Sequence, residues 1–445
     1  MFDNAKTPLS KSQRIALTGL FLMIFLFGAW VELRGAFLKR PMTDLGVYLR
    51  AAYAVRVGGD LYGITDDNDW HYVYPPFFAI VLTPLADPPK GADRTGYLPY
   101  GLTVGLWYLL TMALGLWGCH LLAKALEETS LEPELRNPPK YSQQWWALRV
   151  LPFLILMPAI GRSQMRGQTG LIVAFLLSAM AASILRGKRF RAGLWLSVAS
   201  AIKVIPTFIF LMPLWRRDWK MLFGGALGLL LTLIIIPLMA MGLDKTVTAY
   251  QTLYNEVLMA GLKGETNATR ADELTCITCT DSNSPMTVLH NILNPHRPAR
   301  PREALPVVRA GHWLLAVLLT AITLKAAKWR GDMGIKGKVE CSPTEVLFLG
   351  QLALLMCVIS PVFHPHYVSM LLPLVMVMLF LIWQRYGYGK VPFGFNCVFW
   401  LLIISHIITA IGGMFWPLRD FGLVLLSTLV LWGAGIVLMC KGDTK

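Results

Sequence analysis

The stretch that decides the fold is Arg186–Lys220, RGKRFRAGLWLSVASAIKVIPTFIFLMPLWRRDWK. Its apolar middle, residues 192–215, is long enough to cross a membrane. Basic residues flank it on both sides: Arg186, Lys188, Arg189, Arg191, Arg216, Arg217 and Lys220. Because lysine and arginine concentrate in short cytoplasmic loops, both ends belong on the same side of the membrane. The segment therefore predicts a hairpin of two short helices that turns near Lys203 and Pro206.

The rest of the chain repeats this apolar character. Of its 445 residues, 55% are hydrophobic and 15% are charged, whereas soluble proteins carry about 25% charged residues. Membrane-length apolar runs lie near residues 15–33, 101–123, 147–161, 168–185, 220–241, 306–324, 344–360, 366–383, 394–412 and 420–439. With the hairpin, these predict an all-α polytopic membrane protein of about twelve transmembrane helices. We expect residues 1–445 to form a single membrane domain with both termini in the cytoplasm.

The chain is strongly basic, with a formal net charge of +15. Nucleic-acid binding needs a clustered basic face with aromatic residues on a soluble element, and no such element is evident. We therefore attribute the charge to positive-inside topology and expect no nucleic-acid partner.

Two loops on the outer side are long, 34–100 and 243–305. In the first, apolar residues after Asp44 recur at helical spacing: Leu45, Tyr48, Leu49, Ala52 and Val55. This pattern predicts an amphipathic helix at the membrane interface that ends at Gly58–Gly59. The second loop carries Cys276 and Cys279, which could form a redox pair or a local disulfide.

The predicted threading collects unusual polar residues on the outer face: Asp44, Arg162, Arg166, Gln168, Lys203, His364 and His366. Asp44 is a candidate general base, although an aspartate at this place could instead cap the helix. Lys203 lies at the hairpin tip, where an intramembrane lysine costs about 2.5–3.5 kcal/mol and needs a partner. It could bind phosphate, or its amine could extend to the interface.

The remaining polar candidates also allow two interpretations each. Arg162 and Arg166 could hold a phosphate through bidentate hydrogen bonds, or contact lipid head groups. His364 and His366 could contact a phosphate or a sugar, bind a metal, or form a polar turn between helices. No third metal ligand is evident, so we expect neither a metal nor another cofactor.

Four blocks occur in an order that resembles glycosyltransferase family 87. They are Asp44 to Tyr62 with Tyr74-Pro75-Pro76 and Thr83-Pro84-Leu85; Gly167-Gln168; Ala192-Gly193 through Lys203 to Pro206; and Ser360-Pro361 with His364-Pro365-His366. The resemblance implies a GT-C enzyme that uses a polyprenyl-phosphate sugar. The chain departs from the family where Phe363 precedes His364, and where Ser282-Asn283-Ser284 replaces an Asn-Gln-Ser-type motif.

This resemblance implies that Asp44 deprotonates an acceptor hydroxyl, which attacks the anomeric carbon with inversion. The phosphate would be bound by Lys203, Arg162, Arg166, His364 and His366, and the sugar or acceptor by Tyr48, Tyr74, Gln168 and Asn283. The acceptor would be a lipid or a glycan, and mannose is the default hexose. We expect a bacterial plasma membrane protein with its site on the outer face. The alternatives are a transporter or flippase of a lipid-linked or anionic substrate, and a scaffold without activity.

Overall fold

The computed structural model describes residues 8–38, 42–130, 132–259, 277–278, 282–331, 341–411 and 416–441. Within these ranges the secondary structure is helical, apart from two isolated β-bridges. Eight segments are long and apolar enough to cross a membrane: α1 with η2 (Lys11–Phe37), α4 (Tyr100–Thr129), α5 (Gln143–Arg166), α9 to α10 (Trp219–Met241), α15 (Pro306–Gly331), η8 with α17 (Pro365–Tyr386), α18 (Phe393–Ala410) and α20 (Leu423–Lys441).

Shorter helices complete the bundle in the described part of the chain. Three are apolar: α6 (Gly170–Leu185), η4 with α8 (Ile205–Arg216) and α16 (Pro343–Val358). Together with α7 (Arg189–Ile202), they bring the helices of the bundle to the predicted twelve. The expected all-α polytopic architecture is confirmed. The observed helices overlap the predicted runs and extend beyond them by up to seven residues, at the end of α15.

The predicted hairpin is present as α7 followed by η4 and α8. α7 ends at Ile202, Lys203 takes an extended conformation (φ −144°, ψ 128°), and η4 begins at Ile205. The backbones of α7 and α9 (Trp219–Leu229) lie very close together at Gly193. A Cβ atom on Gly193 would lie only 2.1 Å from the Met221 carbonyl oxygen. A larger residue at Gly193 would therefore separate α7 from α9.

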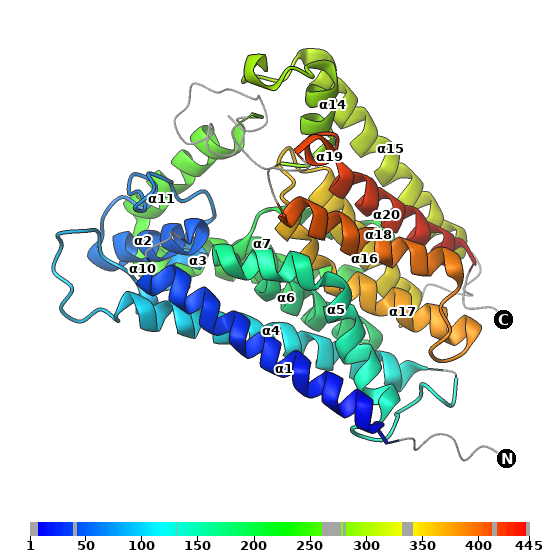
Figure 1. Cartoon of the computed structure of the whole chain (residues 1–445). Helices are drawn as coiled ribbons and strands as arrows, with labels where there is room; N and C mark the ends of the chain where they lie inside the picture. The colour runs from blue at the N-terminus through cyan, green and yellow to red at the C-terminus, as the bar shows by residue number, and fades with distance from the viewer. Residues whose placement is uncertain are drawn as a thin grey trace.

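The core is formed by α6, α16 and the η8–α17 segment. Every residue of α6, α16 and η8 is buried. α1 and α15 lie at the edges of the bundle (Figure 1). Many of their large apolar side chains are exposed, including Phe25 and Leu314 at 71% each, as expected of surfaces that face lipid.

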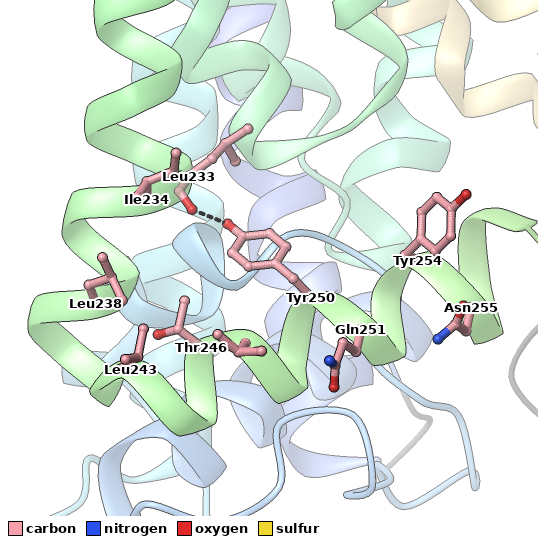
Figure 2. A pocket seen from close by; sticks show the side chains of 10 residues that line it. Leu233, Ile234, Leu238, Leu243, Thr246, Tyr250, Gln251, Tyr254 and Asn255 are labelled. Atoms are coloured by element: carbon pink, nitrogen blue, oxygen red, sulfur yellow. Dashed lines mark hydrogen bonds between the residues drawn. The ribbon is translucent and has the colours of Figure 1, made fainter.

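The second long loop begins with a helix that turns away from the bundle. After Gly242 (φ 80°), α11 (Leu243–Thr252) and η6 (Leu253–Met259) run across the end of α10 (Ile236–Met241) (Figure 2). An open apolar groove of about 480 Å³ separates them from η5 (Leu230–Ile235).

Within this groove the Tyr250 hydroxyl donates a hydrogen bond to the Leu233 carbonyl. Farther along, the loop contains α14 (Pro285–Leu293) and η7 (Arg297–Ala299). The Cys276–Cys279 pair lies outside the described residues.

Candidate active site

Asp44 sits on α2 (Thr43–Val57), the predicted helix of the first long loop, which ends at Gly58 (φ 69°) as expected. The prediction that α2 buries one face only was wrong. Val47, Arg50 and Ala51 are buried as well as Leu45, Tyr48, Leu49 and Ala52 of the predicted stripe, whereas Val55 is half-buried. α2 therefore packs inside the protein, and Asp44 has a rigid support.

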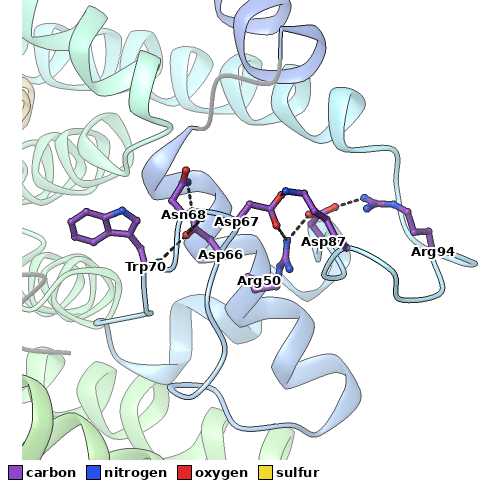
Figure 3. Close-up of polar contacts among 8 residues, drawn as sticks. Arg50, Asp66, Asp67, Asn68, Trp70, Asp87 and Arg94 are labelled. Carbon is purple, nitrogen blue, oxygen red and sulfur yellow. Dashed lines mark hydrogen bonds and ion pairs between the residues drawn. The ribbon is translucent and has the colours of Figure 1, made fainter. Parts of the chain in front are cut away.

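The loop after α2 is held down by a network of aspartates and arginines (Figure 3). Arg50 donates to Asp67 at 3.1 Å and to Asp87 at 3.5 Å, and Arg94 also donates to Asp87. Burial raises the pKa of Asp87, and Arg94 and Arg50 oppose this rise. Asp66 accepts hydrogen bonds from the backbone amides of Asn68 and Trp70. After this loop the chain passes Tyr74 and forms two short helices, α3 (Pro76–Val81) and η3 (Thr83–Leu85).

Asp44 forms an ion pair with Arg166, whose Nε atom lies 2.8 Å from its Oδ2 atom. The N-cap interpretation of Asp44 was wrong, because Met42 occupies the N-cap position and Asp44 lies inside the first turn. A carboxylate there is still stabilised by the helix dipole. Asp44 is thus fixed from two sides, by its helix and by Arg166.

Arg162 and Arg166 lie in the last turns of α5, which extends five residues beyond the predicted run at 147–161. α5 continues to Arg166 because the first left-handed residue is Gly167 (φ 71°), which ends the helix. A Cβ atom on Gly167 would lie 2.4 Å from Leu45 Cβ. The end of α5 therefore meets the start of α2 through a position that only glycine fits.

We expect Gly167→Ala to destabilise the protein and to lower its activity, because it displaces the first turn of α2 that carries Asp44. Left-handed backbone alone costs a non-glycine residue roughly 1–2 kcal/mol. Gly389→Ala is the matched control, because Gly389 has φ 73° with no atom within 4 Å of its would-be Cβ. Thermal unfolding in detergent should show a larger decrease in Tm for Gly167→Ala. Equal decreases for both variants would contradict the contact with Leu45.

Tyr48, Tyr74 and Gln168 gather next to this ion pair. The Tyr48 hydroxyl donates to Gln168 Oε1 at 3.2 Å, and the Tyr48 and Tyr74 ring centroids are 5.5 Å apart. Burial, and next the carboxylate of Asp44, raise the pKa of Tyr74 to about 12. The Tyr74 phenol therefore stays protonated and can donate a hydrogen bond at any physiological pH.

Lys203 is 3% exposed and lies among aromatic rings. Its Nζ atom is 3.9 Å from the Tyr367 ring centroid and 5.9 Å from that of Tyr74. The interfacial alternative for Lys203 was therefore wrong, because its amine is inside the protein. The charges of Asp44 and Arg166 both reach it. Tyr367 directly follows the His364-Pro365-His366 motif, but no pattern in the sequence marked it as a residue of the site.

The two histidines lie side by side before and at the start of η8. Their rings stack at 5.2 Å with an interplanar angle of 13°. His366 is 3% exposed and lies within reach of the charges of Arg166, Lys203 and Arg162. In the described part of the chain, its Nε2 atom has no hydrogen-bond partner.

The second long loop reaches this motif through Ser282 and Asn283. The backbone N–H of Asn283 donates to the Phe363 carbonyl at 2.6 Å. The backbone N–H of Phe363 donates to Ser282 Oγ at 3.1 Å. Asn283 is fully buried. The structure thus places Ser282 and Asn283 next to His364.

Arg162 lies at the edge of this group. Its guanidinium donates to the backbone carbonyl of Thr409 and, at 3.5 Å, to the Thr409 hydroxyl. Thr409 is at the end of α18, where carbonyl groups lack intrahelical partners. Arg162 therefore also joins α5 to α18.

These side chains make a site with excess positive charge. Three cations, Arg162, Arg166 and Lys203, accompany one carboxylate, Asp44. Such a site can bind a phosphate and hold a base beside it. Among the described residues, no group of three or more histidine, cysteine, aspartate or glutamate side chains is placed to hold a metal ion.

Residues 72–361 match the sequence profile of glycosyltransferase family 87. The chain belongs to this family. The matched range covers Tyr74, Arg166, Lys203 and Asn283. Asp44 lies before it and His366 lies after it, and the fold brings both to the matched residues. The chain is thus a membrane glycosyltransferase whose candidate site extends beyond the matched range.

Two further comparisons are less informative. ArnT from Cupriavidus metallidurans bound to undecaprenyl phosphate is a solved structure that resembles this chain with a TM-score of 0.38 and 11% identity. The alignment covers 96% of this chain and 77% of ArnT. A likeness this weak carries no argument about function. No curated protein matches this glycosyltransferase significantly.

Proposed function

We propose that this glycosyltransferase moves a hexose from a polyprenyl phosphate to an acceptor hydroxyl, with inversion at the anomeric carbon. The observation that carries the proposal is the Asp44–Arg166 ion pair, which joins a candidate base to a candidate phosphate ligand at 2.8 Å. Beside it the Lys203 amine lies 5.9 Å from the Tyr74 ring centroid and 3.9 Å from that of Tyr367, and the His366 and Tyr367 ring centroids are 5.0 Å apart. A base beside a cationic phosphate site is what transfer from a sugar phosphate requires.

In the proposed reaction Asp44 accepts the proton of the acceptor hydroxyl. The acceptor oxygen forms a bond to the anomeric carbon, and the bond from this carbon to the phosphate oxygen breaks. The electron pair leaves with the polyprenyl phosphate, whose charge is stabilised by Arg166 and Lys203. Arg166 contacts both Asp44 and the phosphate, and therefore aligns the base with the leaving group.

The remaining residues of the site have secondary roles in this proposal. His366 donates from Nε2 to the phosphate, while His364 is the more exposed of the pair and faces the sugar side. The sugar or the acceptor forms hydrogen bonds with the side chains of Tyr48, Tyr74 and Gln168. Arg162 contributes charge from its place beside Thr409.

The second long loop supplies the acceptor side of the site. Asn283 lies near His364 because its backbone N–H donates to the Phe363 carbonyl, and we assign it to the acceptor. We propose a lipid or glycan acceptor on the outer face of a bacterial plasma membrane. Mannose is the first sugar to test.

The apolar tail of a polyprenyl donor also needs a surface near the site. The groove between η5 and α11 is lined mainly by apolar side chains, including Leu233, Leu238 and Leu243. We propose this groove as the surface for the donor's apolar tail. This arrangement supports a lipid-linked donor over a soluble nucleotide sugar.

Proteoliposomes with the purified protein and a radiolabelled polyprenyl-phosphate mannose test this function. With a lipid extract of the source cells as acceptor, we expect label in a new lipid or glycan product. A radiolabelled nucleotide sugar should give no product. Movement of intact donor across the bilayer without product would favour the transporter. If neither transfer nor movement occurs with any hexose donor, the transferase proposal is wrong.

A further inference from the structure

A second crevice opens between α4, α6 and α7, away from the candidate active site. Its cavity volume is about 130 Å³. α6 begins at Gly170, near Gln168, and ends at Leu185, so its far end is about 24 Å from the site along the helix. The crevice follows α6 from Phe175 to Arg186, a length of about 16 Å.

Three aromatic residues line one part of the crevice: Trp117, Phe175 and Trp195. The Trp117 and Phe175 ring centroids are 5.1 Å apart with an interplanar angle of 31°. Trp195 meets Phe175 edge to face at 6.0 Å. Two small residues of α6, Ala179 and Ala182, also line the crevice. This part offers an apolar surface to a hydrocarbon chain.

The rim of the crevice, by contrast, is cationic. Arg186, Lys188 and Arg191 line it from the α6–α7 turn and the first turn of α7. Arg186 pairs with Glu128 at 2.9 Å, and the Arg191 guanidinium lies 5.5 Å from the Trp195 ring. Three cations and one carboxylate leave the rim with two net positive charges.

We propose that this crevice is a specific site for an anionic phospholipid, with the phosphate at the rim and one acyl chain along the aromatic wall. Basic pockets between transmembrane helices suit anionic head groups, and the rings suit a chain. Arg186, Lys188 and Arg191 lie at the end of the bundle that the positive-inside rule assigns to the cytoplasm. The lipid would therefore belong to the cytoplasmic leaflet.

The shape and charge of the crevice favour an anionic phospholipid over a soluble anion or a zwitterionic lipid. A cavity volume of about 130 Å³ holds only part of a phospholipid, namely its phosphate group and a segment of one chain. The rest of the lipid remains in the bilayer. A soluble anion would use the rim but would leave the aromatic wall unoccupied. A zwitterionic lipid would gain less from two net positive charges.

Native mass spectrometry of the full-length protein, titrated with phosphatidylglycerol or phosphatidylcholine in detergent, tests the proposal. We expect one phosphatidylglycerol to bind at least about tenfold more tightly than phosphatidylcholine, since each basic residue near a membrane surface adds appreciable attraction. Arg186→Gln, Lys188→Gln and Arg191→Gln together should abolish this preference. Trp195→Leu should weaken the binding of both lipids.

The matched control changes the same number of charges elsewhere. Lys140, Lys220 and Lys390 are exposed lysines outside the crevice. Their combined replacement by glutamine should leave the preference intact, as should Arg186→Lys with Arg191→Lys. Equal binding of both lipids by the wild-type protein would overturn the proposal. It would also be overturned if the control lost as much preference as the rim variant, because the attraction would then be diffuse.

Discussion

Asp44→Asn is expected to lower the kcat of sugar transfer by about 10²- to 10⁴-fold, the usual contribution of a general base. Asparagine keeps the size of the side chain but cannot accept the acceptor's proton. The KM for the donor should not rise, because Arg166 loses its ion pair with Asp44 and becomes more available to the phosphate. Initial rates of transfer from a labelled polyprenyl-phosphate sugar in proteoliposomes measure both constants.

Asp93→Asn is the matched control for this variant. Asp93 lies in the same long loop, but it is exposed and its side chain accepts hydrogen bonds from Thr95. We expect wild-type rates from Asp93→Asn. Transfer at the wild-type rate by Asp44→Asn would remove Asp44 as the base and leave its ion pair as a structural contact.

Lys203→Met is expected to reduce kcat/KM for the donor by about 10²- to 10³-fold, as the loss of one oxyanion-stabilising donor does in other enzymes. Methionine retains an unbranched side chain of similar length but carries no charge. Because burying a cation is costly, the variant should unfold at the same or a higher temperature than the wild type. Reduced activity without reduced stability separates phosphate binding from a structural role.

Lys203→Arg should not restore activity. The amine is 3.9 Å from the Tyr367 ring centroid and nearly fully buried, so a planar guanidinium does not fit the same position. Lys220→Met is the control, because Lys220 is exposed at the start of α9. An unchanged kcat/KM in Lys203→Met would contradict the phosphate-binding role.

Much of the fold follows from the sequence because membrane insertion depends on local properties. Apolar runs of membrane length predicted the helices, and basic clusters on both sides of residues 192–215 predicted the hairpin. Pro206 and Gly58 mark the turn and the helix end for stereochemical reasons that act within a few residues. The same local reasoning failed for α2, because burial on its remaining faces comes from elements distant in the sequence.

The relations among the candidate site residues came only from the tertiary structure. Asp44 and Arg166 are 122 residues apart, and sequence patterns could not distinguish a helix cap from an ion-paired base. Contact with Tyr367 showed that Lys203 is inside the protein, and Phe363 linked the second long loop to the histidines.

By itself, the sequence determined which segments form helices and which polar residues are too costly to bury without a partner, because composition and periodicity act locally. Only the tertiary structure decided which of those residues meet, because side-chain contacts depend on how the finished helices pack.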